Sequence, residues 1–261
     1  MKKRWMALLG AAVVTINLFA GCGSTGAEQT GNNADGTATE AVQGKDSAGG
    51  GNAAQSVAGS ADTVIVAMSP SSEPAAGFNP CINWGCGEHC HEPLIQSTLI
   101  RTNVDMEFEN DLATDYSVSE DGLTWTFHIR DDVKFTDGEP LTASDVAFTF
   151  NTALATPNSE ADLSMLDSVE APDDTTVIFH MSKPYNAFLY TLAVFGIVPE
   201  HCYDEAAYGE NPVGSGRYIL TQWDKGQQVV LEANPDYYGD EVQMKKVIVL
   251  FMEEDAALAA V

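Results

Sequence analysis

Residues 23–61 restrict folding most, because this segment lacks the apolar side chains that a core needs. It holds nine Gly and nine Ala in 39 positions, no aromatic residue, and mostly Ser, Thr, Asn and Gln elsewhere. Such a composition buries too little apolar area to offset the loss of chain entropy. We therefore expect residues 22–61 to form a disordered tether, with an r.m.s. span on the order of 35 Å. The folded domain is expected over residues 62–261.

Residues 1–21 have the features of a lipoprotein signal peptide. A basic stretch at residues 1–4 precedes an apolar run over residues 5–20, which is too short for a comfortable membrane span. The run ends in Leu-Phe-Ala-Gly-Cys22, which resembles the lipobox of bacterial lipoproteins. That resemblance implies that Cys22 becomes the lipidated N-terminus and anchors an extracytoplasmic protein to the cell membrane. The alternative is an ordinary signal peptide with a chance cysteine.

The charge balance limits the class of partner. The chain has 12 Lys and Arg against 38 Asp and Glu, which gives a formal net charge of -26. Because such a surface repels phosphate backbones, we expect no nucleic-acid partner. With 44% hydrophobic residues, the chain can still bury a substantial core. The balance is typical of a soluble extracytoplasmic protein whose ligand is uncharged, cationic or enclosed in its own pocket.

Hydrophobic periodicity predicts a mixed α/β domain. Residues 63–67 form a short apolar run, interpreted as a buried strand. Residues 123–129 alternate strictly between apolar and polar side chains, and Asp121-Gly122 supplies a turn before them. With the next run, Val133–Phe135, and the Asp137-Gly138 turn, this pattern predicts a β-meander.

Helices and further strands follow. Thr142 and Asp145 form a capping box that predicts a helix ending before Pro157, with Val146, Phe150, Ala153 and Leu154 on its buried face. Residues 175–181 alternate again, and a second helix is predicted over residues 185–194. A hairpin is predicted around Asp224-Lys-Gly226, between residues 218–220 and 229–232, and a last strand over residues 244–251. Residues 253–261 are expected to begin a helix that the chain does not complete, which indicates an N-terminal fragment.

A cysteine- and histidine-rich loop is the main candidate for metal chemistry. Residues 81–91 contain three Cys and two His. Thiolates and imidazoles at this density bind nickel, copper or zinc, so the candidate metal ligands are Cys86, His89, Cys90 and His91. The alternative is structural: exported proteins form disulfides, and Cys81, Cys86, Cys90 and Cys202 allow two bridges in three connectivities.

No pattern in the chain indicates catalysis. A phosphate-binding Gly-x-x-x-x-Gly-Lys loop and a Gly-x-Ser-x-Gly elbow are both absent from the sequence. Pro93 follows His91-Glu92 and excludes a helical His-Glu-x-x-His zinc site. His128 and His180 fall on the polar faces of predicted strands, where a structural or exposed role is expected. We therefore expect no enzyme activity, no catalytic residues and no required cofactor.

Several motifs together resemble the family 5 extracellular solute-binding proteins, the peptide/nickel type of ABC importers. The longest is Asp121-Gly-Leu-Thr-Trp-Thr-Phe-His-Ile-Arg-Asp-Asp-Val-Lys-Phe-Thr-Asp-Gly-Glu-Pro-Leu-Thr-Ala-Ser-Asp-Val146. The others are residues 92–94, 196–201, 213–216 and 232–239. Arg217 stands where the family usually has Pro, which is a local departure.

The resemblance implies a periplasmic-binding-protein-like fold (type II, cluster C). The chain would supply the first lobe with its inserted subdomain, and the second lobe would be absent. It also implies capture of a short peptide or a nickel or other transition-metal chelate, and delivery to a membrane permease of an ABC importer. Trp84, His89 and Phe195 are expected to face the ligand. A stand-alone metal-chelate sensor or scavenger, or an exported hydrolase, remains as the alternative.

Overall fold

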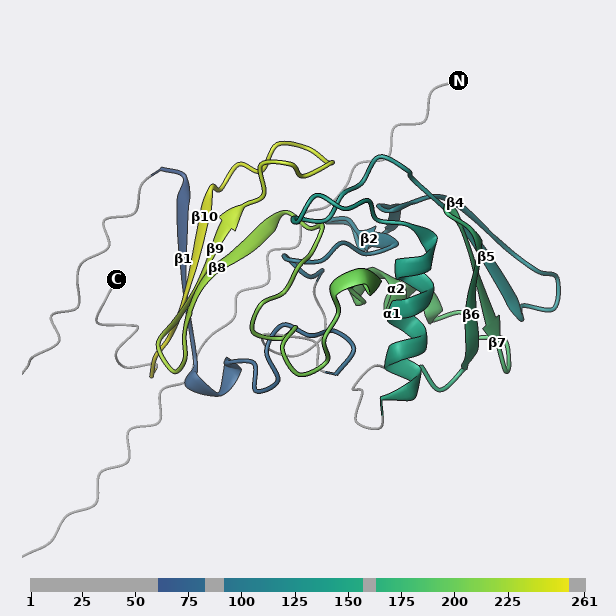
Figure 1. Ribbon diagram of the computed structural model, residues 1–261, viewed down its shortest axis with the longest axis horizontal. Coiled ribbons are helices and arrows are strands. Elements are labelled where there is room, and N and C mark those ends of the chain that lie inside the picture. The colour runs from purple at the N-terminus through teal and green to yellow at the C-terminus, as the bar shows by residue number, and fades with distance from the viewer. Residues whose placement is uncertain (1–60, 83–91, 157–162, 254–261) are drawn as a thin grey trace, which may run out of the picture. The chain divides into compact units, whose positions relative to one another are not determined.

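The computed structural model describes residues 61–82, 92–156 and 163–253 (Figure 1). The predicted signal peptide, the tether, most of the cysteine- and histidine-rich loop and the final helix lie outside these residues. Among the described residues, no helix is long and apolar enough to cross a membrane.

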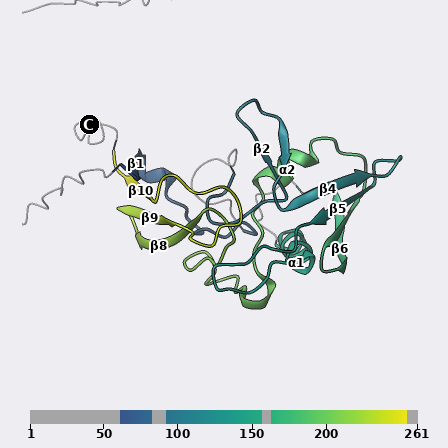
Figure 2. The ribbon, with the colours of Figure 1, turned by 90° about the horizontal axis from the view of Figure 1, so that it is seen from above.

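One four-stranded sheet contains both ends of the described chain. Its strands are β1 (Thr63–Met68), β10 (Lys246–Phe251), β9 (Gln228–Ala233) and β8 (Tyr218–Asp224), in that spatial order. β1 pairs in parallel with β10, and the other neighbours pair antiparallel. Figure 2 shows β1 beside β10 and β8 beside β9. The predicted hairpin is confirmed: Gly226 takes φ +75° in the turn, a conformation that favours glycine.

The prediction that residues 63–67 form a buried strand is half right. The strand forms, but the side chains of Val64, Ile65 and Val66 are 37–39% exposed. The reason is position in the sheet: β1 is an edge strand with β10 as its one neighbour among the described residues. An apolar run predicts a strand, but the place of the strand in the sheet decides how far its side chains are buried.

A second four-stranded sheet is antiparallel throughout. Its order is β4 (Ala113–Val118), β5 (Thr124–Ile129), β7 (Thr176–Met181) and β6 (Leu166–Asp173). The alternation predicted for residues 123–129 is confirmed, because Trp125, Phe127 and Ile129 are buried and His128 is exposed.

The predicted β-meander is wrong in its last strand. The neighbours of β5 are β4 and β7, and Val133–Phe135 forms no strand. The backbone of this run instead closes on the segment that follows it, through hydrogen bonds from Phe135 N to Glu139 O (2.9 Å) and from Leu141 N to Val133 O (3.0 Å). Val133 and Phe135 are nevertheless buried, so the apolar pattern reports their burial and not their pairing.

Two α-helices accompany this sheet. α1 (Ala143–Ala155) has the predicted capping box, and the Asp145 carboxylate accepts a hydrogen bond from Thr142 N at 2.8 Å. α1 packs against β6 and β7 (Figure 1). α2 (Phe188–Val194) is shorter than the predicted helix over residues 185–194. Residues 185–187 form a turn in which Tyr185 O accepts from Phe188 N at 3.2 Å.

β4 and β6 were not predicted from the sequence. The remaining elements are short and were not predicted either. They are the 3₁₀ turns η1 (Pro70–Ser72) and η2 (Glu200–Cys202) and the hairpin of β2 (Ile100–Thr102) with β3 (Phe108–Asn110). The larger hydrophobic cluster includes Phe127, Phe150 and Phe179, and a second cluster includes Val229 and Val247 from the first sheet.

Candidate functional site

Several separate segments of the chain are hydrogen-bonded to residues 92–98. The backbone carbonyls of this segment accept hydrogen bonds from three segments that are distant in sequence. Ile95 O accepts from Gly216 N at 2.8 Å and Leu94 O accepts from Tyr218 N at 2.9 Å. Ser97 O accepts from Ile197 N at 2.9 Å, and Thr98 O accepts from Leu112 N at 3.1 Å. The segment is therefore held in place from several directions.

Glycines allow these backbones to approach so closely. A Cβ atom on Gly214 would lie 2.1 Å from Ile95 O, and one on Gly216 would lie 2.6 Å from Leu94 O. A Cβ atom on Gly196 would lie 2.6 Å from the Cβ atom of Gln96. Any side chain at these positions would push segment 92–98 away. The glycines of two motifs therefore have a packing role here.

Asn234 joins a further motif to the same region. It is buried, its backbone N donates to Arg217 O at 2.8 Å, and its Nδ2 donates to Gly216 O at 3.0 Å. Its Oδ1 also accepts from Asp236 N at 3.0 Å, an Asx turn that orients the following residues. Motif segments 196–201, 213–216 and 232–239 thus all meet around segment 92–98, which itself begins with motif 92–94. We call this region the motif junction.

An ion pair lies in the motif junction. Glu92 Oε1 lies 2.7 Å from Arg217 Nη1, and the two side chains are 23% and 31% exposed. Burial raises the pKa of Glu92, and the charge of Arg217 opposes this increase. The Arg217 guanidinium carbon lies 5.7 Å from the centre of the Tyr237 ring. A half-buried charge pair with an aromatic neighbour is well suited to orient a charged ligand group.

A cluster of polar side chains lies nearby. The buried Ser97 and the half-buried Asp111 face Tyr238 in it, and both interact with the Tyr238 hydroxyl. Burial raises the pKa of Asp111, while Tyr238, Arg101 and Arg217 pull it down. Arg130 lies over the Tyr238 ring at 4.5 Å.

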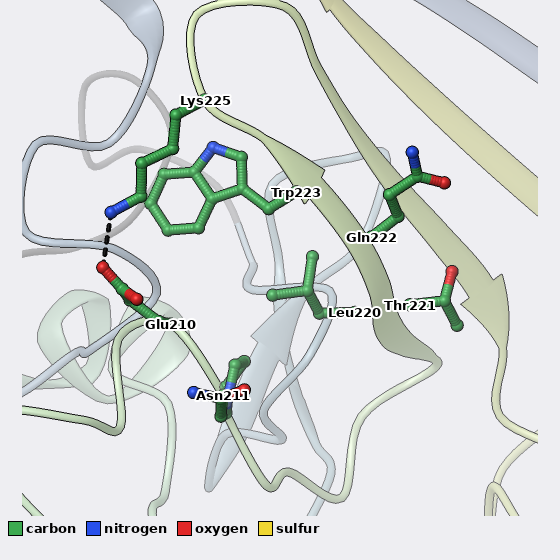
Figure 3. A pocket seen from close by; sticks show the side chains of 8 residues that line it. Glu210, Asn211, Leu220, Thr221, Gln222, Trp223 and Lys225 are labelled. Atoms are coloured by element: carbon green, nitrogen blue, oxygen red, sulfur yellow. Dashed lines mark hydrogen bonds and ion pairs between the residues drawn. The ribbon is translucent and has the colours of Figure 1, made fainter.

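Two hollows are open to solvent near the junction and on the first sheet. One, of about 450 Å³, is lined by residues that include Asn234, Tyr237 and Lys245. The other, of about 420 Å³, lies between residues 210–212 and β8 (Figure 3).

Two side chains that line the hollow in Figure 3, Trp223 and Lys225, are engaged in contacts within the protein. Trp223 Nε1 donates to Glu73 Oε1 at 2.8 Å, and the Phe78 ring meets the indole edge-on at 5.3 Å. Lys225 lies 5.0 Å from the centre of the indole ring and pairs with Glu210 (Figure 3). The aromatic surface that would stack on a ligand is thus engaged, which leaves the hollow beside Tyr237 as the better candidate.

Most of the sequence-predicted site residues lie outside the described residues. These are the lipidation residue Cys22, the ligand-facing Trp84 and the metal candidates Cys86, His89, Cys90 and His91. The described chain resumes at Glu92, so the predicted loop leads directly into the motif junction. Ile197, two residues after the predicted ligand-facing Phe195, donates from its backbone N to Ser97 O in the motif junction.

Phe195 does not fit its predicted role in this structure. Its side chain has no exposed surface and stacks on Phe150 with 4.8 Å between ring centres. A ring packed in the large core cannot contact a ligand unless the core opens. Phe195 is therefore a core residue in this structure, and the prediction that it faces a ligand is corrected.

The two described cysteines are both free thiols. Cys81 is fully buried, its Sγ lies 3.7 Å from Thr149 O, and burial raises the pKa of its thiol to about 12. Cys202 is exposed on η2, and burial together with Asp137 raises the pKa of its thiol. Neither forms one of the disulfides considered from the sequence.

The main site residues that sequence reasoning missed are Asp111 and the partnership of Arg217 with Glu92. The sequence does show that Arg217 departs from the family pattern. It does not show that Glu92 is the partner of Arg217, because 125 residues separate the two side chains.

Comparison with known proteins decides the family. Residues 107–261 match the family described as bacterial extracellular solute-binding proteins, family 5 Middle. The chain belongs to this family. Its members are extracytoplasmic binding proteins rather than enzymes, and their fold is that of the periplasmic binding proteins, of which this chain covers part of one lobe.

Curated relatives and solved structures agree with this assignment. The chain is 35% identical over 185 residues to the probable D,D-dipeptide-binding periplasmic protein DdpA of Escherichia coli, covering 67% of this chain and 36% of the relative. It is 35% identical over 204 residues to protein XP55 of Streptomyces lividans, covering 75% of this chain and 36% of that protein. The chain therefore spans about a third of the length of these relatives.

Two solved structures share the fold of the family 5 chain. NikZ from Campylobacter jejuni, in complex with Ni(L-His), matches with a TM-score of 0.66 and 30% identity, over 76% of this chain and 41% of NikZ. DppA from Helicobacter pylori, in complex with the peptide STSA, matches with a TM-score of 0.65 and 25% identity, over 76% of this chain and 44% of DppA.

Proposed function

We propose that this family 5 chain acts in the substrate-binding lipoprotein of an ABC importer. The protein captures a short peptide or a nickel or other metal chelate and delivers it to permease subunits in the membrane. The single observation that carries the proposal is the motif junction, where three family motifs converge on segment 92–98, which itself begins with a fourth, beside a half-buried charge pair.

The chemistry of the junction supports a ligand that carries charge. Arg217 matches a carboxylate, such as that of a peptide C-terminus or a chelating amino acid, and Glu92 matches an ammonium group. Peptides and metal–amino-acid chelates carry both groups. The curated relatives with peptide-binding names and the NikZ complex support the same ligand classes.

Lobe closure would supply the selectivity. A ligand favours a closed state only if it makes contacts there that the open state lacks. The junction contributes one side of such contacts, and a second lobe contributes the other. No cofactor takes part, and binding is not followed by a chemical step.

Native mass spectrometry of the full-length protein tests the ligand class. We expect a co-purified peptide or metal chelate that is lost on denaturation, and at least about tenfold weaker rebinding in Arg217→Met, because about 1.4 kcal/mol corresponds to a factor of ten. Lys225→Met is the control, since Lys225 pairs with Glu210 in the other hollow, away from the motif junction. Failure of a panel of peptides and nickel, copper and zinc chelates to bind would contradict the proposal.

Membrane anchoring through Cys22 is a separate part of the proposal. If Cys22 carries lipid, the wild-type protein partitions into detergent, and Cys22→Ala is released or keeps its signal peptide. Unchanged detergent partitioning of a Cys22→Ala protein with normal signal cleavage would refute the anchor and leave the binding role intact.

A further inference from the structure

Three metal-binding side chains meet on the surface away from the cysteine- and histidine-rich loop in sequence. His201 Nε2 lies 2.7 Å from Asp137 Oδ2, and Cys202 Sγ lies 3.9 Å from the same oxygen. One donor atom from each of the three residues lies within 4.8 Å of the other two. All three residues are exposed, so an ion reaches them without any opening of the fold.

We propose that Asp137, His201 and Cys202 form a binding site for a divalent metal ion of the zinc type. The set offers one oxygen, one nitrogen and one sulfur, which are the three donor types that zinc accepts. With a water molecule as the fourth ligand, three protein ligands make an open tetrahedral site.

The present geometry is close to that required. Zinc bonds of about 2.0–2.3 Å in a tetrahedron place neighbouring donors about 3.3–3.6 Å apart. The three donors already lie within 4.8 Å, so side-chain shifts of about an ångström complete the site. On binding, the ion replaces the hydrogen bond between His201 and Asp137, and the Cys202 thiol releases its proton to solvent and binds as the thiolate.

The surroundings favour a cation. Glu139, Asp145 and Glu200 line a hollow of about 300 Å³ together with His201. Their carboxylates add negative potential beside the site, in a chain whose net charge is already -26.

The backbone positions the donors from two separate elements. His201 and Cys202 belong to η2, while Asp137 lies in the turn that contains Gly138 at φ +97°. Thr136 N donates to Gly214 O at 2.9 Å, which links this turn to the glycine-rich segment of the motif junction. A bound ion would thus link η2 to the turn at Gly138 and restrain the glycine-rich segment that is hydrogen-bonded to this turn.

The test must separate this site from the predicted loop site. A background protein with Cys86→Ser, Cys90→Ser, His89→Ala and His91→Ala removes the loop ligands. Zinc titration by calorimetry should still detect one site in this background. Adding Asp137→Asn, His201→Ala or Cys202→Ser should weaken zinc binding at least about tenfold in each case, a loss of about 1.4 kcal/mol.

His128→Ala is the matched control. His128 pairs with Asp115 at 2.8 Å on an exposed surface, but no thiol joins this pair in the described residues. The control should bind zinc as the background does. Cobalt substitution gives a second readout. The thiolate-to-cobalt absorption should disappear in Cys202→Ser and persist in Cys81→Ser.

The outcomes are decisive for the site. Absence of zinc binding in a folded background protein, or equal zinc binding with and without Cys202→Ser, would overturn the proposal. Either result leaves the transport proposal untouched, because peptide or chelate binding at the motif junction is measured separately.

Discussion

The carboxylate of Glu92 lies 2.7 Å from the guanidinium of Arg217, across 125 residues of sequence. This ion pair connects the start of segment 92–98 to Arg217, which lies between the glycine-rich motif and the first residue of β8. It also sets the charge at the point where the predicted ligand loop enters the described fold. Its energetic role can be measured without knowledge of the ligand.

The first prediction concerns this pair. Arg217→Met leaves the half-buried Glu92 without its partner and should lower the free energy of unfolding by about 1–3 kcal/mol, between the values for exposed and buried pairs. Urea denaturation measures the loss. Arg101→Met, which breaks a more exposed pair with Glu109, should cost less than about 1 kcal/mol. Strict additivity of Glu92→Gln and Arg217→Met in the double variant would show that the two residues are not coupled.

The second prediction concerns the capping box of α1. The buried Asp145 accepts hydrogen bonds from Thr142 N at 2.8 Å and from Glu200 N at 2.9 Å. Asp145→Ala removes a cap and also leaves the Glu200 N–H unpaired, so we expect a loss of about 2–4 kcal/mol. Thr142→Ala removes the cap contribution of one side chain and should cost about 1 kcal/mol. Equal losses by thermal or urea denaturation would mean that the bond to Glu200 contributes nothing.

The third prediction concerns pH. Burial raises the pKa of Asp111 above its ordinary value of 3.8. The unfolded chain releases this proton first, so the native protein loses stability as pH rises from about 4 through the folded-state pKa. Asp111→Asn removes that loss, and its stability relative to the native protein should improve over this interval in urea denaturation.

Asp132 provides the opposite control for the pH measurement. The hydrogen bond from Arg130 lowers the pKa of this exposed carboxylate. Its contribution is present above the ordinary pKa and is lost as pH falls, so Asp132→Asn should lose stability relative to the native protein as pH rises. The same pH slope for both variants would contradict the assigned burial of Asp111.

The fourth prediction concerns thiol reactivity. Cys202 is exposed, whereas Cys81 is fully buried with a thiol pKa of about 12. Because the thiolate is the reactive form, an alkylating reagent should modify Cys202 in the native protein and Cys81 only after unfolding. Peptide mapping by mass spectrometry distinguishes the sites. A Cys81–Cys202 disulfide in exported protein, which would block both thiols, is the result that contradicts this expectation.

Local elements of the fold were predictable because their signals are local. The alternation at Trp125, Phe127 and Ile129 reports directly which face of a strand is buried. The capping box at Thr142 and the turn glycine at position 226 specify backbone conformations within a few residues. The linear motifs also carried the family resemblance, which the comparison confirmed.

Contacts between distant segments were not predictable in the same way. The exposure of Val64–Val66 depends on which strands lie beside β1, and the run Val133–Phe135 is buried without joining the sheet. Phe195 was expected at a ligand and is instead packed against Phe150. In each case, the side chain's hydrophobicity is a property of the sequence, whereas its neighbours depend on the path of the chain.

The sequence by itself determined the class of fold, the family and the local chemistry of the turns and helix ends. Only the tertiary structure brought three motifs together around segment 92–98 and paired Glu92 with Arg217. It also placed Asp137 beside His201 and Cys202, across 64 and 65 residues. The physical reason is that periodicity and turn propensity act over a few residues, while a site forms when burial of the core draws remote segments into contact.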